Sequence, residues 1–221
     1  MTVTEILAKL ESLSDIKVRA MNIKRSGPEN QFGVKMGDIR NVAKKIKPDN
    51  ELAKALWATN NVEARFVATL IMVPKDLSIP EIEDLVKTER YAYVIDWLYS
   101  YVIKEYPDKE KLRLQWLHAD DVMEARLSWS LTSGRIAHNP QGIDIQAVLD
   151  RIETEMPTAP PDVQWTMNST LANIGIYHST YRQRALDIGE RLGIYRDYPV
   201  SKGCTSPFAP IWINAIVNRQ G

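Results

Sequence analysis

The residue best placed for chemistry in this sequence is Asp96, which stands among aromatic side chains in the stretch RYAYVIDWLYSYVIK, residues 90–104. At helical spacing its neighbours are Ala92, Tyr93, Tyr99, Ser100 and Ile103. A second, more apolar face of the same helix carries Tyr91, Ile95, Leu98 and Val102. One face would pack, and the other would be available for chemistry centred on a carboxylate. Because an unpaired buried carboxylate is costly, Asp96 requires either a cationic partner or a cleft.

An internal sequence repeat indicates which helices would position such a site. Trp57 followed by Glu63-Ala64-Arg65 recurs about sixty residues later as Trp116 followed by Glu124-Ala125-Arg126. One helix pair, which holds Asp96, separates the copies, so the repeat unit is roughly thirty residues, shorter than the ~40 of HEAT repeats. Stacked helix pairs form a solenoid whose concave surface is lined by the second helix of each pair. Those inner helices would carry Arg65, Asp96, Arg126 and Trp165. Glu-Ala-Arg is also a common helical triplet, so chance remains an alternative.

The hydrophobic pattern predicts an all-α protein, because period-3.6 patterns recur and strand-like alternation is nearly absent. Short linkers that contain proline or glycine favour antiparallel helix pairs. We expect one HEAT-like repeat domain over residues 1–221, with a loop-plus-helix extension from about residue 193. The predicted helices are Thr4 to Leu13, Ile16 to Arg25, Gly37 to Ile46, Asn50 to Thr59, Val62 to Val73, Ile79 to Thr88, Tyr91 to Tyr106, Lys109 to His118, Val122 to Ala137, Ile145 to Met156, Pro161 to Tyr177, Thr180 to Leu192 and Pro207 to Arg219.

Composition excludes several classes of protein. The chain has 221 residues, of which 44% are hydrophobic, enough for a sizeable core. It has no apolar run of membrane-spanning length and no signal-peptide pattern at its N-terminus. Cys204 is the only cysteine, and the histidines His118, His138 and His178 lack metal-ligand spacing. We therefore expect a cytoplasmic monomer with no metal, no cofactor and no membrane partner.

The charge of the chain is balanced overall but unevenly distributed. The formal net charge is zero, which argues against indiscriminate binding to nucleic acid. Between residues 17 and 47, however, only Glu29 and Asp38 oppose nine basic residues, namely Lys17, Arg19, Lys24, Arg25, Lys35, Arg40, Lys44, Lys45 and Lys47. Such a region can grip a polyanion, although a solvated helix face would have the same composition.

Several short motifs resemble the AlkD-like DNA alkylation repair family, whose members are HEAT-like helical solenoids. The resemblance enters at Phe32-Gly-Val-Lys-Met-Gly-Asp-Ile-Arg40 and at LAKALWATNNVEARFVATLIM, residues 52–72. It continues at Asp96, at Arg126 within MEARLSW and at Trp165 within VQWTMNSTLANIGI. The motifs are individually short, but their order and spacing extend from about residue 32 to residue 177.

The resemblance implies an enzyme that removes positively charged N7- or N3-alkylpurines from double-stranded DNA by hydrolysing the N-glycosidic bond. It implies that Asp96 is the catalytic carboxylate, that Arg126 contacts DNA and that Trp165 contacts the lesion. The family has a second tryptophan four residues before the carboxylate, where this sequence has Ala92. Tyr93, next to it, could turn its ring toward the same space. For Asp96 a structural ion pair with Arg65 or Arg126 is the alternative, and for Trp165 it is core packing.

Other residues are predicted to contact DNA through their charge. These are Arg65, the counterpart of Arg126 in the internal repeat, Lys35 and Arg40 in the basic region, and Lys202. Lys202 lies in the SKGCTS segment, where hydroxyls and backbone amides could hold a phosphate oxygen. The alternative interpretation of this segment is a rigid loop that positions the last helix. The second hypothesis for the whole chain is a non-catalytic helical-repeat module that binds DNA or a protein.

Overall fold

The computed structural model describes residues 1–220, which contain thirteen α-helices, three 3₁₀ turns and no strand. The helices are α1 (Val3–Glu11), α2 (Ile16–Lys24), α3 (Met36–Ala43), α4 (Asn50–Trp57), α5 (Val62–Ile71), α6 (Ile79–Lys87), α7 (Ala92–Tyr101), α8 (Lys109–Gln115), α9 (Val122–His138), α10 (Ile145–Glu155), α11 (Pro161–Tyr177), α12 (Ser179–Leu192) and α13 (Ala209–Gln220). The turns are η1 (Pro74–Asp76), η2 (Ile103–Glu105) and η3 (Met156–Thr158). The prediction of an all-α protein is confirmed, and each predicted helix is present.

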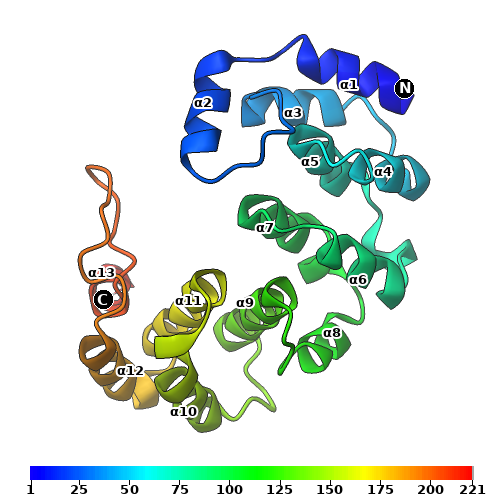
Figure 1. The fold of residues 1–221 in the computed structure, drawn as a ribbon. Coiled ribbons are helices and arrows are strands. Elements are labelled where there is room, and N and C mark those ends of the chain that lie inside the picture. Colours follow the sequence, from blue (N-terminus) through cyan, green and yellow to red (C-terminus); the bar gives the residue numbers. More distant parts are fainter. Residues whose placement is uncertain (221) are drawn as a thin grey trace. The chain divides into compact units, whose positions relative to one another are not determined.

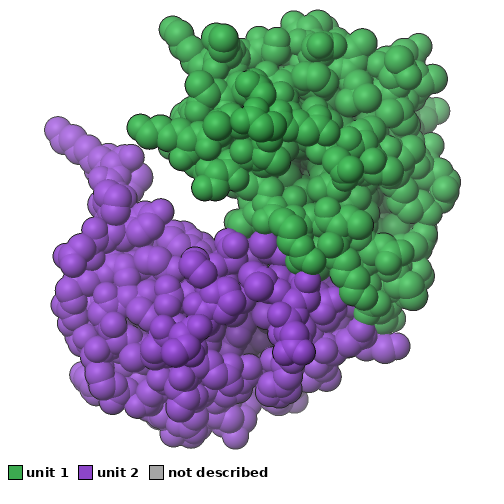
Figure 2. Space-filling view, viewed as in Figure 1, with its two compact units in different colours: residues 1–109 green, residues 110–221 purple. Residues whose placement is uncertain are grey.

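The chain divides into two compact units, residues 1–109 and residues 110–221, which Figure 2 colours separately. Each unit has a central helix of its own, and the expectation of a single domain stays a prediction. No helix within residues 1–220 is long and apolar enough to cross a membrane.

Local sequence determines where most helices begin. Thr2 and Ser78 each form a capping box with a glutamate three residues later, at the starts of α1 and α6. Asp15 accepts hydrogen bonds from the backbone amides of Lys17 and Val18 in the first turn of α2, and Asn61 accepts one from Ala64 in the first turn of α5. Because these caps act over three residues, they can be read from sequence, and the predicted starts agree closely with the observed ones.

The core of the first unit is built around α5, which packs on α3, α4 and α7 (Figure 1). Nine of the ten residues of α5 are buried, including the two charged side chains Glu63 and Arg65. Glu63 accepts hydrogen bonds from the backbone amides of Phe32, Gly33 and Val34 at 2.8 to 3.1 Å. The family-like segment before α3 is therefore fastened to α5 by a buried carboxylate.

The core of the second unit is built around α11, which lies along α9 and also contacts α12 and α13. Its buried apolar face includes Met167, Leu171 and Ile174. At Gly175 the side chain of Ile213 comes so close that an added Cβ would lie 2.5 Å from the Ile213 Cδ1 atom. This glycine therefore allows α13 to approach α11 closely.

One predicted helix is shorter than expected. The pattern predicted a continuous helix from Tyr91 to Tyr106, whereas α7 ends at Tyr101 and the turn η2 follows. The backbone leaves the helical region at Val102, with φ −122° and ψ −63°, and Val102 and Ile103 are fully buried. The spacing had predicted that Ile103 shares a helical face with Asp96. Because Ile103 lies in η2, it does not.

Candidate nucleic-acid interface

The start of α7, the helix that carries Asp96, is held by the buried carboxylate of Glu89. Its Oε1 atom accepts hydrogen bonds from the backbone amides of Arg90 and Tyr91 at 2.8 and 2.7 Å. Its Oε2 atom pairs with Nη1 of Arg65 at 2.8 Å. Glu89 thereby fixes the two residues that precede α7 and ties this segment to α5.

Arg65 is a structural residue in this arrangement. Its side chain is 7% exposed, and it also donates to the Trp57 carbonyl at 3.2 Å and to Asn60 Oδ1 at 2.5 Å. Its carboxylate partner is Glu89, whereas the sequence had left an ion pair of Arg65 with Asp96 as an alternative. Because the guanidinium is buried and its donors are engaged, the structure disfavours the predicted contact of Arg65 with a DNA phosphate.

Asp96 is half-buried on α7, beside a row of aromatic rings on the neighbouring face. Tyr93 is 46% exposed and contacts the edge of Phe66, with ring centroids 5.7 Å apart. Phe66 is 4.7 Å from Trp97, and Trp97 is 5.2 Å from Tyr101. Of the apolar face predicted for this helix, Ile95 and Leu98 are fully buried on α7; Val102 is also buried but follows the helix, and Tyr91 precedes it and is partly exposed.

The two basic residues at α3 that were predicted to contact DNA, Lys35 just before the helix and Arg40 within it, have different surroundings. Arg40 is exposed, lies 4.7 Å from the Trp97 ring centroid and donates to the Tyr101 hydroxyl at 3.4 Å. Lys35, also exposed, is paired with Asp15 at 3.4 Å. Both side chains are accessible to solvent and could reach DNA, and their contact with DNA stays a prediction.

In the second unit, Arg126 and Trp165 are associated with the N-terminal part of α11. Arg126 is 4% exposed; its Nη1 atom donates to the Asp162 carbonyl at 2.7 Å and lies 3.7 Å from the Asp162 carboxylate. Asp162 precedes Trp165 by three residues, so Arg126 fixes the turn of α11 from which the tryptophan projects. The proposed phosphate contact of Arg126 has to be made with the small part of the side chain that remains accessible.

Trp165 is half-buried and contacts two tyrosines from the loop after α12. Its ring centroid is 5.3 Å from Tyr195 and 5.8 Å from Tyr198. Desolvation raises the pKa of the Tyr195 hydroxyl, with a smaller contribution from Tyr198 and an opposing one from Arg126. Tyr195 has a positive φ of 63°, an uncommon backbone conformation for an aromatic residue. The tryptophan is thus part of a three-ring cluster rather than of the core alone.

The loop that supplies these tyrosines is fastened at both ends. Arg196 donates to the carboxylate of Glu190 at 2.9 Å and lies 4.5 Å from the ring centroid of Phe208. Asn168 donates to the Pro207 carbonyl at 2.8 Å in a buried hydrogen bond. Between these anchors, Lys202 and Cys204 are exposed. A phosphate contact by Lys202 therefore remains a prediction about the free part of the loop.

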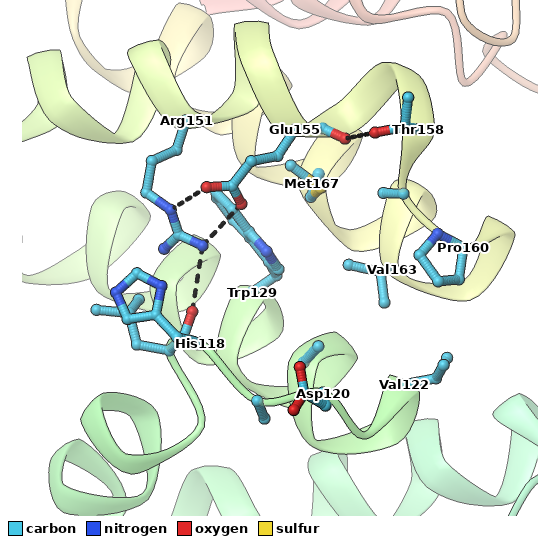
Figure 3. Close-up of a pocket in the computed structure, with 14 residues that line it drawn as sticks. His118, Asp120, Val122, Trp129, Arg151, Glu155, Thr158, Pro160, Val163 and Met167 are labelled. Carbon is cyan, nitrogen blue, oxygen red and sulfur yellow. Dashed lines mark hydrogen bonds and ion pairs between the residues drawn. The ribbon is translucent and has the colours of Figure 1, made fainter.

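The second unit also contains a cavity of about 340 Å³ between α9, α10 and α11, which contains no predicted site residue. Figure 3 shows Arg151 paired with the carboxylate of Glu155, one turn further along α10, through hydrogen bonds of 2.9 and 2.8 Å. Arg151 also donates to the Leu117 carbonyl at 3.1 Å. The same guanidinium lies 5.0 Å from the ring centroid of Trp129. Since the charge of Arg151 is neutralised by Glu155, this cavity lacks the free cation that a phosphate would need.

Some residues of the interface were missed by the sequence interpretation. Trp97 and Tyr101 follow the predicted Tyr93 at spacings of four, a pattern that could have identified the aromatic row. Nothing in the local sequence identifies Glu89 as the ion-pair partner of Arg65, because the two residues are 24 positions apart.

Comparisons with known proteins bear on the family and the fold. The family model described as DNA alkylation repair enzyme matches residues 6–203. A solved structure of a protein related to the HEAT-like repeat DNA glycosylases, with affinity for branched DNA structures, matches with a TM-score of 0.82 and 22% identity. The match covers 100% of this chain and 95% of that chain, and it confirms the HEAT-like repeat fold. None of the curated proteins matches the sequence. The extent of the family match establishes that the chain belongs to the DNA alkylation repair enzyme family.

Proposed function

We propose that this protein is a DNA glycosylase that excises positively charged N7- or N3-alkylpurines from double-stranded DNA. The observation that carries the proposal is the position of Asp96, a half-buried carboxylate on α7 beside the exposed ring of Tyr93, in a member of the DNA alkylation repair family. The protein would act as a monomer in the cytoplasm and would need no cofactor.

The chemistry requires little more than a fixed negative charge. An alkylated purine is a cationic leaving group, so the bond between C1′ and the base nitrogen can break without a strong general acid. Positive charge then develops on the deoxyribose, and a nearby carboxylate stabilises it. Asp96 would also orient the water whose oxygen joins C1′ and whose proton is released. Each of the two predicted lesion-contacting rings, Tyr93 in the first unit and Trp165 in the second, would stabilise a cationic base that stacks on it through a cation–π contact.

Release of 7-methylguanine from methylated duplex DNA tests the proposal. Wild-type protein is expected to release the base, and Asp96→Asn is expected to abolish release while it leaves the fold intact. Asp84→Asn is the matched control, because Asp84 is an exposed aspartate on α6 of the same unit. No release by the wild type, or full release by Asp96→Asn, rejects the proposal.

The position occupied by Ala92 supports a second candidate function, a non-catalytic module that binds DNA. The family has a tryptophan at this position, and the structurally similar protein has affinity for branched DNA structures. In this case wild-type protein would bind a four-way DNA junction more tightly than a duplex and would release no base. If Ala92→Trp then creates base release, the missing ring is the reason for the inactivity.

A further inference from the structure

We propose that the exposed aromatic row of α7, together with Arg40, is a stacking surface for an unpaired nucleic-acid strand. The row consists of Tyr93, Trp97 and Tyr101, with Phe66 beneath it. This inference rests on the proposed action on DNA and specifies the form of strand that this unit holds. It gives a role to Tyr101 and Trp97, which the glycosylase chemistry does not use.

Three planar groups of this surface are accessible or nearly so. Tyr93 and Tyr101 are 46% and 36% exposed, which is unusual for two large rings on one helix face. Between them Trp97 is mostly buried, but the guanidinium of Arg40 lies over its ring. Unpaired bases stack on aromatic rings and on arginine guanidinium planes alike. The surface therefore offers a ring, a guanidinium and a second ring in succession.

The length of the row suits several nucleotides. Tyr93 and Tyr101 are eight residues apart on α7, which corresponds to about 12 Å along the helix axis. A strand with bases spaced about 3.4 Å apart places three to four nucleotides over that distance. The rings are held in place by their neighbours, since each consecutive pair from Tyr93 through Phe66 and Trp97 to Tyr101 has centroids within 5.7 Å. Little side-chain freedom would be lost when bases stack on them.

The charge around the row complements a polyanion rather than a protein's apolar surface. Arg40 is hydrogen-bonded to Tyr101 at one end of the row and lies over Trp97. Elsewhere in the same unit, α2, α3 and their flanking segments expose further basic residues, namely Lys17, Lys24, Arg25, Lys35, Lys44, Lys45 and Lys47. Aromatic rings bordered by basic residues are the combination that binds single strands without sequence preference.

Fluorescence anisotropy with the full chain tests the inference. The probes are an oligothymidylate of about 20 nucleotides, longer than the footprint of about 4 to 16 nucleotides typical of one single-strand-binding domain, and a duplex of the same length. Tyr101→Ala is expected to weaken binding of the single strand about 5- to 150-fold and to change duplex binding much less. Tyr101→Phe retains the ring and is expected to bind like the wild type.

The matched control is Tyr177→Ala, because Tyr177 is 49% exposed at the end of α11, in the other unit, and belongs to no ring cluster of the described residues. Unchanged single-strand binding by Tyr101→Ala, or an equal loss for single strand and duplex, overturns the inference. The base-release assay separates the two proposals. Tyr101-dependent strand binding without base release supports the stacking surface and rejects the glycosylase, whereas base release with a Tyr101→Ala variant that binds single strands normally rejects the stacking surface alone.

Discussion

Replacement of Arg65 by methionine distinguishes a structural role from a DNA-contacting role for this arginine. The variant Arg65→Met keeps an unbranched apolar stem and removes the guanidinium. The substitution eliminates the 2.8 Å ion pair with Glu89, the hydrogen bonds to the Trp57 carbonyl and to Asn60, and the interaction of the guanidinium with the Trp57 ring, whose centroid is 5.0 Å away. Glu89 would then remain buried without its cation.

The expected loss of stability follows from the burial of the pair. Removal of one partner of a buried ion pair costs about 3–5 kcal/mol, because the other charge is left uncompensated. Glu89 retains its hydrogen bonds from the amides of Arg90 and Tyr91, which favours the lower end of that range. For a chain of this size the loss corresponds to a decrease in Tm of roughly 6–20 °C. The double variant Arg65→Met/Glu89→Gln should recover part of it.

Two measurements on two variants test this reasoning. Urea unfolding gives the free energy of unfolding, and the dependence of duplex binding on salt counts phosphate contacts. Arg65→Met should lose stability and keep the wild-type salt slope. The matched variant Arg40→Met, at an exposed arginine, should keep its stability within about 1 kcal/mol and reduce the salt slope. If Arg65→Met is as stable as the wild type and its salt slope decreases by about one, Arg65 contacts a phosphate and the structural assignment is wrong.

Three further predictions concern packing and pH. Glu63→Ala leaves two buried backbone donors and one partly buried donor unsatisfied, so the free energy of unfolding should decrease by about 2–6 kcal/mol; a decrease below about 1 kcal/mol would contradict the buried contacts. Gly175→Ala brings a methyl group against Ile213, and thermal unfolding should show a loss of about 1–3 kcal/mol; unchanged stability would mean that α13 can shift freely. Hydrogen bonds from Lys54 are the largest cause that lowers the pKa of Glu81 from 4.5 to about 2. The stability from the charged Glu81 is therefore fully present above pH 4.5 and is lost as the pH falls toward 2. In urea unfolding between pH 5 and 2, Glu81→Gln should lose less stability than the wild type; identical pH profiles would refute this linkage.

Much of the fold could be predicted because its signals are local. Caps such as Asn61 and proline-containing breaks act within a few residues, so the thirteen helices were identified with ends close to those observed. The family resemblance was also carried by short segments, and the family match confirms it. The end of α7 was missed because the apolar pattern continues through Val102 and Ile103, which are fully buried, whereas the backbone leaves the helical region at Val102.

The sequence by itself determined the helices, the family and the candidate carboxylate, since helical periodicity and motif order are properties of neighbouring residues. The sequence could not show that Arg65 and Arg40 have different roles, because it predicted contact with DNA for both. Only the tertiary structure decided that Arg65 is buried against Glu89 while Arg40 stays exposed over Trp97. The physical reason is that the free energy of a charged side chain depends on its desolvation and its partners, which are set by packing and not by spacing along the chain.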